Sequence, residues 1–326
     1  MRRPFAPVAL VAIAAATWSC APAGEPPLDA GPTDYRVHVD PSAFDCTSIA
    51  DDPSHVPERG SLVDAACALD PTCRTRQVSA HRGAGGQLGK LAPEDTLSAY
   101  RAGIAIGVEF VETDPRPTAD DVIVNLHDST VDRTTDGTGE VAELTFDQVR
   151  ALHIEGGDRD GDFSCERVPT LIEILGTCRG QVVVLVDANK TDDVAALVQA
   201  IRDADALDWA IFDTSDVAKI DAALALEPGL RFMNRPGSLQ AITEELDHFA
   251  PRLPTIVEVH QEQLGAGVEA IHTRGTRALI DVFGIDVLDN LGGVADYGPI
   301  LDAGIDVLQS DRPELVLQAL RERGER

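Results

Sequence analysis

The chain has 326 residues, which is long for one average domain but normal for a single α/β barrel with a large core. Acidic residues outnumber basic residues 55 to 27, so the net charge is -28 at pH 7. This charge repels polyanions and argues against DNA or RNA as a partner. An anionic substrate would need a local cation, either a metal ion or a well-placed arginine.

The first twenty residues predict a secretory signal rather than part of the fold. A basic start at 1–3 precedes an apolar run over 4–18 that is too short to span a membrane comfortably. Cys20 follows, and the Pro-, Gly- and Ala-rich residues after it indicate an extended linker. Cys20 resembles the acylation site of a bacterial lipoprotein, although Thr17 and Trp18 match such a site poorly. We expect export, either as a lipoprotein of the periplasm, outer membrane or cell surface, or as a secreted protein.

Five further cysteines, in an exported chain, predict disulfides rather than metal ligands, and none of their spacings resembles a zinc site. Cys165 and Cys178 are close in sequence and form the first expected pair. Two of Cys46, Cys67 and Cys73 are expected to form another, which leaves one thiol over. Residues 21–75 are therefore predicted to be a linker followed by a disulfide-stapled extension.

From residue 76 onward, short β-branched runs alternate with amphipathic segments, which is typical of a parallel β/α fold. The expected strands are 77–80, 109–113, 122–127, 182–188, 210–214, 231–235, 255–260, 278–283 and 306–310. The expected helices are 94–107, starting from Pro93 and ending in glycine, and 191–206, 215–226, 238–249 and 267–275.

Nine strands with polar residues at their ends favour a closed TIM-type (β/α)8 barrel over 76–326, although an open doubly wound sheet also suits the alternation. Nine is one more than the barrel holds, and the gap between 109–113 and 122–127 is too short for a crossover helix. The barrel is therefore somewhat irregular near its second and third strands, or one strand is an extra. The sequence has no GxGxxG after the first strand and no Walker pattern.

Acidic side chains gather where two of the expected strands end. Alternation places Glu112 and Asp114 on one side of the same strand, and Asp187 ends a later strand. Three carboxylates at one barrel rim would repel one another unless a hard cation lay among them, and such oxygen ligands suit calcium or magnesium. His81 and His127 end separate strands and form a natural acid/base pair near neutral pH.

The order of several separated motifs resembles the glycerophosphodiester phosphodiesterase family. These motifs are AHRG (80–83), PEDT (93–96), the run from 108 to 141, PTLIEIL (169–175), VLVDANK (184–190) and IDVLQSDRPEL (305–315). The resemblance covers roughly residue 77 to the C-terminus. It implies a TIM barrel, one divalent cation (calcium or magnesium) and hydrolysis of glycerophosphodiesters to an alcohol and glycerol 3-phosphate.

Matched position by position, the resemblance assigns the site residues. It implies Glu112, Asp114 and Asp187 as metal ligands, His81 and His127 as catalytic residues, and Arg82 as a phosphate contact. It implies that Glu94, in the PEDT motif, supports the site, and Glu258 is a further candidate for support without a family counterpart. Residues 128–165 resemble the family's small inserted cap over the site.

The chain departs from the family pattern at the end of the expected strand that carries the VLVDANK motif (184–190). The family's usual Glu-x-Lys is here Asp187-Ala188-Asn189, so Asn189 takes the phosphate-binding position, and Lys190 would point the other way on a regular strand. The family's late tryptophan is replaced by ALIDVFG (278–284).

Three functions stay open on the sequence. The first is the exported diesterase, acting on a small-molecule substrate without a protein partner. The second is a phospholipase C- or D-like activity on intact lipids, and the third is an envelope lipoprotein with impaired catalysis and a binding role. The inserted segment favours the soluble substrate, because relatives acting on intact lipids generally lack it. Which histidine is the acid, and whether water or the substrate's own hydroxyl attacks, is not fixed by sequence.

Overall fold

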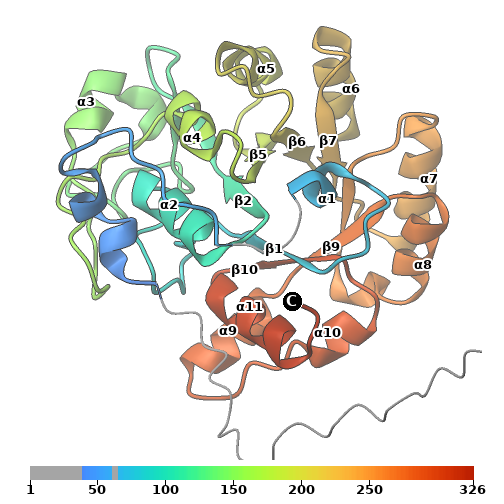
Figure 1. Cartoon of the computed structure of the whole chain (residues 1–326). Coiled ribbons are helices and arrows are strands. Elements are labelled where there is room, and N and C mark those ends of the chain that lie inside the picture. The colour runs from blue at the N-terminus through green and yellow to red at the C-terminus, as the bar shows by residue number, and fades with distance from the viewer. Residues whose placement is uncertain (1–38, 61–64) are drawn as a thin grey trace, which may run out of the picture. The chain divides into compact units, whose positions relative to one another are not determined.

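The computed structural model describes residues 39–60 and 65–326 (Figure 1). The predicted signal, most of the linker and Cys20 lie outside these residues. Eight parallel strands close into a barrel in the order β1-β10-β9-β8-β7-β6-β5-β2. They are β1 (Gln77–Ala80), β2 (Phe110–Thr113), β5 (Val183–Asp187), β6 (Ala210–Thr214), β7 (Arg231–Asn234), β8 (Ile256–Val259), β9 (Arg277–Asp281) and β10 (Val307–Ser310). Because β1 pairs with both β2 and β10, the sheet has no open edge, and the barrel prediction is confirmed.

The ninth expected strand is an extra. Residues 122–127 contribute β4 (Ile123–Asn125), which pairs antiparallel with β3 (Pro115–Pro117) in a separate two-stranded sheet. A short connection can join antiparallel strands but cannot carry a parallel crossover, so this hairpin stays outside the barrel. β5, which carries the VLVDANK motif, therefore pairs directly with β2. This pairing brings Asp187 next to Glu112 and Asp114.

Helices surround the barrel (Figure 1). They are α1 (Ala65–Leu69), α2 (Leu97–Ile106), α3 (Phe146–Ala151), α4 (Leu171–Cys178), α5 (Val194–Asp203), α6 (Val217–Leu226), α7 (Leu239–Phe249), α8 (Ala266–Thr273), α9 (Phe283–Asn290), α10 (Gly298–Asp302) and α11 (Pro313–Glu322). The first predicted helix begins at Leu97, later than expected, because Thr96 is its N-cap and Asp95 has a positive φ of 60°. It ends at Gly107 in the left-handed conformation, as predicted.

The barrel interior is filled by large apolar side chains from its strands, and α1 closes the end at which the strands begin. Phe110, Leu185 and Met233 belong to this inner cluster, together with Ala68 of α1. The buried guanidinium of Arg277, at the start of β9, donates to the carbonyls of Cys67 and Ala68. The closed end is opposite the rim at which the strands end.

The described cysteines pair differently from the first expectation. Disulfides join Cys46 to Cys165 and Cys67 to Cys73, and Cys178 is buried without a disulfide partner among the described cysteines. The predicted Cys165–Cys178 pair is wrong, because α4 carries Cys178 into the apolar core while Cys165 meets the N-terminal extension. A second pair among Cys46, Cys67 and Cys73 is confirmed as Cys67–Cys73.

Residues 128–165 pack around a small apolar cluster in which Val131, Val141 and Val149 meet Val124, Leu126 and Val168. This segment contains α3 and the 3-10 turn η3 (Val141–Glu143). The Cys46–Cys165 disulfide fastens its end to the N-terminal extension. Within the described residues, no helix has the length and apolar character needed to cross a membrane.

Candidate active site

A cavity of about 330 Å³ opens at the rim where the barrel strands end. Side chains that follow several different strands line it: His81, Arg82, Gln87, Leu88, Glu112, Asp114, His127, Asp187, Lys190, Arg235, Asp281, Phe283, Val287, Gln309 and Asp311. Six of the residues singled out in the sequence therefore share one cavity. In TIM barrels this rim carries the active site.

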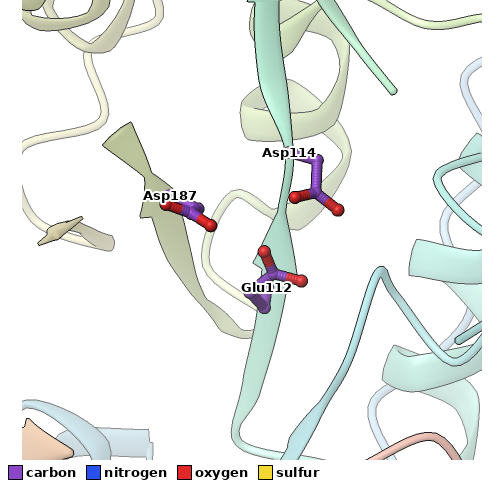
Figure 2. A group of neighbouring side chains, drawn as sticks. All are labelled: Glu112, Asp114 and Asp187. Atoms are coloured by element: carbon purple, nitrogen blue, oxygen red, sulfur yellow. The ribbon is translucent and has the colours of Figure 1, made fainter. Parts of the chain in front are cut away.

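The three predicted metal ligands lie together at the ends of β2 and β5 (Figure 2). Glu112, Asp114 and Asp187 are buried, and one oxygen of each lies within 4.8 Å of the others. Burial, with the charges of Asp114 and Asp187, raises the pKa of Glu112 well above its usual range. Oδ2 of Asp114 is buried and accepts no hydrogen bond from any described residue. Converging oxygens with a vacant acceptor fit a hard divalent cation such as Ca²⁺ or Mg²⁺.

Arg82 enters the cavity from the turn after β1. Its φ is 53°, and the next residue, Gly83, has a φ of 69°. A Cβ on Gly83 would lie 2.8 Å from the carbonyl carbon of Ala99 in α2, so only glycine fits this close turn. The Arg82 backbone N–H donates to Oε2 of Glu112 at 3.1 Å, and its Nε lies 3.5 Å from Oδ2 of Asp114. The turn therefore fixes a cation directly beside the acidic cluster.

Glu94 holds Arg82 in place. Its Oε1 accepts from Nη1 of Arg82 at 2.8 Å, and both carboxylate oxygens accept from Arg133 at 2.8 and 2.6 Å. Burial would raise the pKa of Glu94, but the hydrogen bonds and charges of the two arginines hold it below its usual value. Glu94 thus supports the site through Arg82, and Arg133 connects the inserted segment to it.

His81 is oriented by a carboxylate from the last barrel strand. Its Nδ1 lies 2.6 Å from Oδ1 of Asp311, and its Nε2 lies 3.8 Å from Oε2 of Glu112. The Phe283 ring packs on the imidazole with 4.3 Å between centroids. Because an ionised carboxylate only accepts, Nδ1 carries the shared hydrogen and Nε2 is left toward the acidic cluster.

His127, which follows β4, also lines the cavity and is held in a similar way. Its Nδ1 lies 2.8 Å from Oδ1 of Asp128, whose other oxygen accepts from Nε of Arg133 at 2.6 Å. Burial lowers the pKa of His127 below 6.5, although the Asp114 charge and the Asp128 hydrogen bond oppose the shift. The ring is therefore neutral near pH 7 and able to accept a proton.

The residues after β5 do not continue as a regular strand, which the sequence analysis assumed. Asp187 is followed by the 3-10 turn η4 (Ala188–Lys190) rather than by further strand, so alternation no longer applies. Lys190 consequently lines the cavity, with Nζ 3.4 Å from Oδ1 of Asp114, and the expectation that it points away is wrong. Asn189 lies outside the lining and is exposed; its amide donates to Asp187 and accepts from Thr214.

Arg235, which follows β7, was not singled out in the sequence. Its guanidinium forms ion pairs with Asp213 and, at 3.1 Å, with Glu258, and lies 3.8 Å from Asp187. Burial raises the pKa of Asp213 to about 7 and that of Glu258 to about 8, and Arg235 opposes both shifts. Glu258 therefore supports the cavity through Arg235. Arg235 and Asp311 could have been found in the sequence in the same way as the other candidates, because each is a charged residue that directly follows a strand.

Comparison with known proteins relates this cavity to one family. The glycerophosphoryl diester phosphodiesterase family model matches residues 81–226. Glycerophosphodiester phosphodiesterase 1 of Bos taurus is 47% identical over 111 residues, which are 34% of this chain and 32% of that protein. The Mus musculus protein of the same name is 40% identical over 143 residues, covering 43% and 40%. The matches thus span between about a third and two fifths of the length of these curated relatives.

Solved structures share the fold. A glycerophosphoryl diester phosphodiesterase from Parabacteroides distasonis aligns with a TM-score of 0.67 at 22% identity, covering 81% of this chain and 93% of that chain. An Oleispira antarctica phosphodiesterase, solved in complex with the product sn-glycerol-3-phosphate, aligns with a TM-score of 0.62 at 23% identity, covering 76% and 97%. The match to the family model over residues 81–226 and the curated relatives relate this part of the chain to the glycerophosphodiester phosphodiesterase family, and the solved structures share its barrel fold.

Proposed function

We propose that this protein hydrolyses glycerophosphodiesters to an alcohol and glycerol 3-phosphate and needs a divalent cation, Ca²⁺ or Mg²⁺, to do so. The observation that carries the proposal is the single cavity shared by two oriented imidazoles, three cationic side chains and three converging carboxylates. The names of the curated relatives and the glycerol phosphate bound by the Oleispira antarctica phosphodiesterase support this substrate class.

Each group has a distinct role in the proposed reaction. Glu112, Asp114 and Asp187 would hold the cation, which when bound withdraws charge from a phosphoryl oxygen as a Lewis acid. Arg82 and Lys190, both beside Asp114, stabilise the negative charge that grows on the non-bridging oxygens. Fixed cations, rather than water, therefore stabilise the negative charge of the transition state.

The two histidines would move the protons. Asp311 and Asp128 each hold the Nδ1 of one ring, so Nε2 is the atom left to exchange a proton with the substrate. One Nε2 takes the proton of the attacking hydroxyl, which belongs to water or to the glycerol of the substrate. The other ring, protonated, gives its proton to the departing alcohol oxygen.

Asn189 in place of the family's lysine is the reason to consider a lipoprotein with impaired catalysis. The site compensates for this change. Asn189 removes a cation from the family position, but η4 turns Lys190 into the cavity one residue later. A positive charge is therefore retained near the proposed phosphate position, and we favour the enzyme over a binding protein.

We further propose that the protein works outside the cytoplasm. The Cys46–Cys165 and Cys67–Cys73 disulfides support this location, since such bonds persist in oxidising compartments. Anchoring through a lipid on Cys20 and release as a secreted protein both agree with these bonds. Mass spectrometry of the N-terminus of the mature protein would distinguish them, because acylation at Cys20 adds the mass of the lipid.

The function is tested with a panel of glycerophosphodiesters that differ in the alcohol, with glycerol 3-phosphate as the measured product. The purified protein should release it, lose activity with a chelator and regain it with Ca²⁺ or Mg²⁺. His81→Ala and His127→Ala should each lower kcat by about 10²- to 10⁴-fold. His248→Ala is the matched control and should not change the rate, because His248 is an exposed residue of α7 that pairs with Asp221 of α6. Product release unaffected by His127→Ala would refute the acid/base assignment.

A further inference from the structure

One arginine holds the main chain around His127. Nε of Arg116 donates to the carbonyls of Leu126 and His127 at 3.0 and 3.1 Å, and its Nη2 donates to the carbonyl of His127 at 2.6 Å. A guanidinium suits this task because its donors lie in one rigid plane and reach two acceptors at once. The residue that carries the imidazole is therefore fastened to β3, the strand of Arg116.

His127 depends on this contact because it lies outside regular secondary structure. It follows β4 on a bend, and within residues 39–60 and 65–326 no other hydrogen bond reaches its main chain. The Nδ1 contact to Asp128 fixes the ring relative to the next residue of the same loop. Arg116, in contrast, fixes the loop relative to the hairpin of β3 and β4. The two contacts position the ring together.

Arg116 itself lies on a stiff strand. It stands between Pro115 and Pro117 in β3, and proline fixes its own φ and restricts the residue before it to extended backbone. Arg116 pairs with Val124 of β4 in the antiparallel register. Prolines fit here because the two strands form a separate sheet outside the barrel. The guanidinium thus starts from a fixed backbone, which lowers the entropy that is lost when it binds the two carbonyls.

The same hairpin joins the loop of His127 to a predicted metal ligand. The main-chain N–H of Asp114 donates to Oδ1 of Asn125 at 2.7 Å, and the carbonyl of Asp114 accepts from the N–H of Leu126 at 2.9 Å. Asn125 is fully buried, so this connection is shielded from water. Because Arg116 follows Asp114 by two residues, one short hairpin sets the place of the carboxylate and of the imidazole.

We propose that Arg116 is a positioning residue, which holds the main chain of residues 126–127 so that His127 presents its imidazole to the phosphodiester. This inference rests on the proposed function and adds a residue to it. Arg116 is not among the residues that line the catalytic cavity, so it acts through His127 rather than on the substrate. Misplacement of a reacting group by about 1 Å costs about 10²-fold in rate, so the loss of Arg116 should lower kcat more than it weakens substrate binding.

The test is a double-mutant cycle between Arg116 and His127. Arg116→Met keeps the aliphatic stem but removes every donor. We expect kcat on glycerophosphocholine to fall by about 10- to 100-fold with KM changed less than about threefold. In the His127→Ala background the same substitution should change kcat less than about twofold, because the ring that it positions is gone.

Arg252 supplies the matched control. It is a half-buried arginine that donates to the main-chain carbonyls of Pro228 and Leu230, just before β7 and away from the rim. Arg252→Met removes the same kind of contact and should leave kcat unchanged. Arg116→Lys keeps the charge but lacks the planar fork, so its kcat should lie between that of the unsubstituted protein and that of Arg116→Met. If thermal unfolding shows that Arg116→Met does not fold, Arg116→Lys takes its place in the cycle, and an unchanged kcat then overturns the inference.

The outcomes distinguish this role from the alternatives. An equal loss of kcat in the His127→Ala background, or an equal loss in Arg252→Met, would overturn the inference. A raised KM with kcat retained would show that Arg116 binds the substrate itself and would overturn it as well. Titration with Mn²⁺ should give the same affinity for Arg116→Met as for the unsubstituted protein; a weaker affinity would show that Arg116 acts through Asp114 instead. No turnover of any diester by the unsubstituted protein would overturn the proposed function, on which the inference rests.

Discussion

The carboxylate of Asp311 lies 2.6 Å from Nδ1 of His81, although the two residues are 230 positions apart in the chain. They meet because β1 and β10 are neighbours in the closed barrel, with Ala80 opposite Ser310. A Cβ on Gly86 would lie 1.8 Å from Oδ1 of Asp311, so the glycine-rich turn leaves room for this carboxylate. The closure of the barrel thereby orients a ring that the sequence places alone at the end of its first strand.

Replacing Asp311 should therefore slow the chemical step more than it weakens substrate binding. Asp311→Asn keeps the size of the side chain but removes the charge and leaves the ring without a defined tautomer. We expect kcat to fall by about 10²-fold with KM changed less than about threefold, because the residue acts through His81. Steady-state kinetics on glycerophosphocholine measures both. Asp302→Asn, an exposed acid paired with Arg323, is the control; an unchanged kcat for Asp311→Asn would contradict the positioning role.

Lys190 should matter for the phosphate rather than for folding. Its Nζ lies in the cavity 3.4 Å from Asp114. Lys190→Met keeps the aliphatic length but removes the charge, so we expect kcat/KM to fall by about 10- to 100-fold. Lys190→Arg should retain most of the activity, and Lys90→Met, an exposed lysine, should retain all of it. If Asn189→Ala lowered kcat/KM more than Lys190→Met does, the phosphate contact would belong to Asn189.

Most of the barrel could be predicted from the sequence, because every barrel strand is a short, largely apolar run that ends in a charged or polar residue or is followed by one. What could not be predicted was whether residues 122–127 join the barrel, since pairing partners depend on the whole sheet. The orientation of Lys190 could not be predicted either, because the switch from strand to 3-10 turn after Asp187 changes which side chains face inward.

Contacts between distant parts of the chain could not be predicted from the sequence either. Cys46 and Cys165 are 119 positions apart, and nothing local distinguishes this pair from the shorter Cys165–Cys178 separation. Asp311 and Arg235 each follow a predicted strand, but their partners His81 and Asp213 are defined only once the strand order is known. The sequence therefore identified most of the cavity's residues and few of their partners.

Stability of the metal-free protein should fall as the pH rises from about 4 to about 8. Burial raises the pKa of Asp281 to about 6, of Asp213 to about 7 and of Glu258 to about 8. Between the ordinary pKa of a carboxyl group, about 4, and these raised values, the folded state holds protons that the unfolded state has lost, so the free energy of unfolding decreases with pH. Thermal unfolding in the presence of a chelator should show Tm falling across this range.

Adding Ca²⁺ or Mg²⁺ should reverse the trend, because the cation binds the ionised cluster of the folded protein. We expect the gain in Tm to be larger at about pH 8.5 than at about pH 6, where Glu112 with its raised pKa competes for protons. Asp187→Asn, which removes one of the three acids, should abolish most of the gain. Equal gains at both pH values would contradict the linkage.

The long disulfide should contribute more stability than the short one. Cys46 and Cys165 close a loop with a sequence separation of 119, whereas Cys67 and Cys73 are separated by 6. Chain entropy predicts a loss of up to about 5 kcal/mol for Cys46→Ala/Cys165→Ala and about 2 kcal/mol for Cys67→Ala/Cys73→Ala. Urea unfolding measures both. An equal or smaller loss for the long disulfide would show that the extension and the inserted segment are held by other contacts.

The most direct test of the account is anomalous diffraction from crystals grown with Mn²⁺, a hard cation that scatters anomalously. We predict one peak in the catalytic cavity, within about 2.0 to 2.6 Å of oxygens from Glu112, Asp114 and Asp187. A peak elsewhere, or none at a Mn²⁺ concentration that restores activity after chelation, would contradict the claim that these three acids enclose the ion.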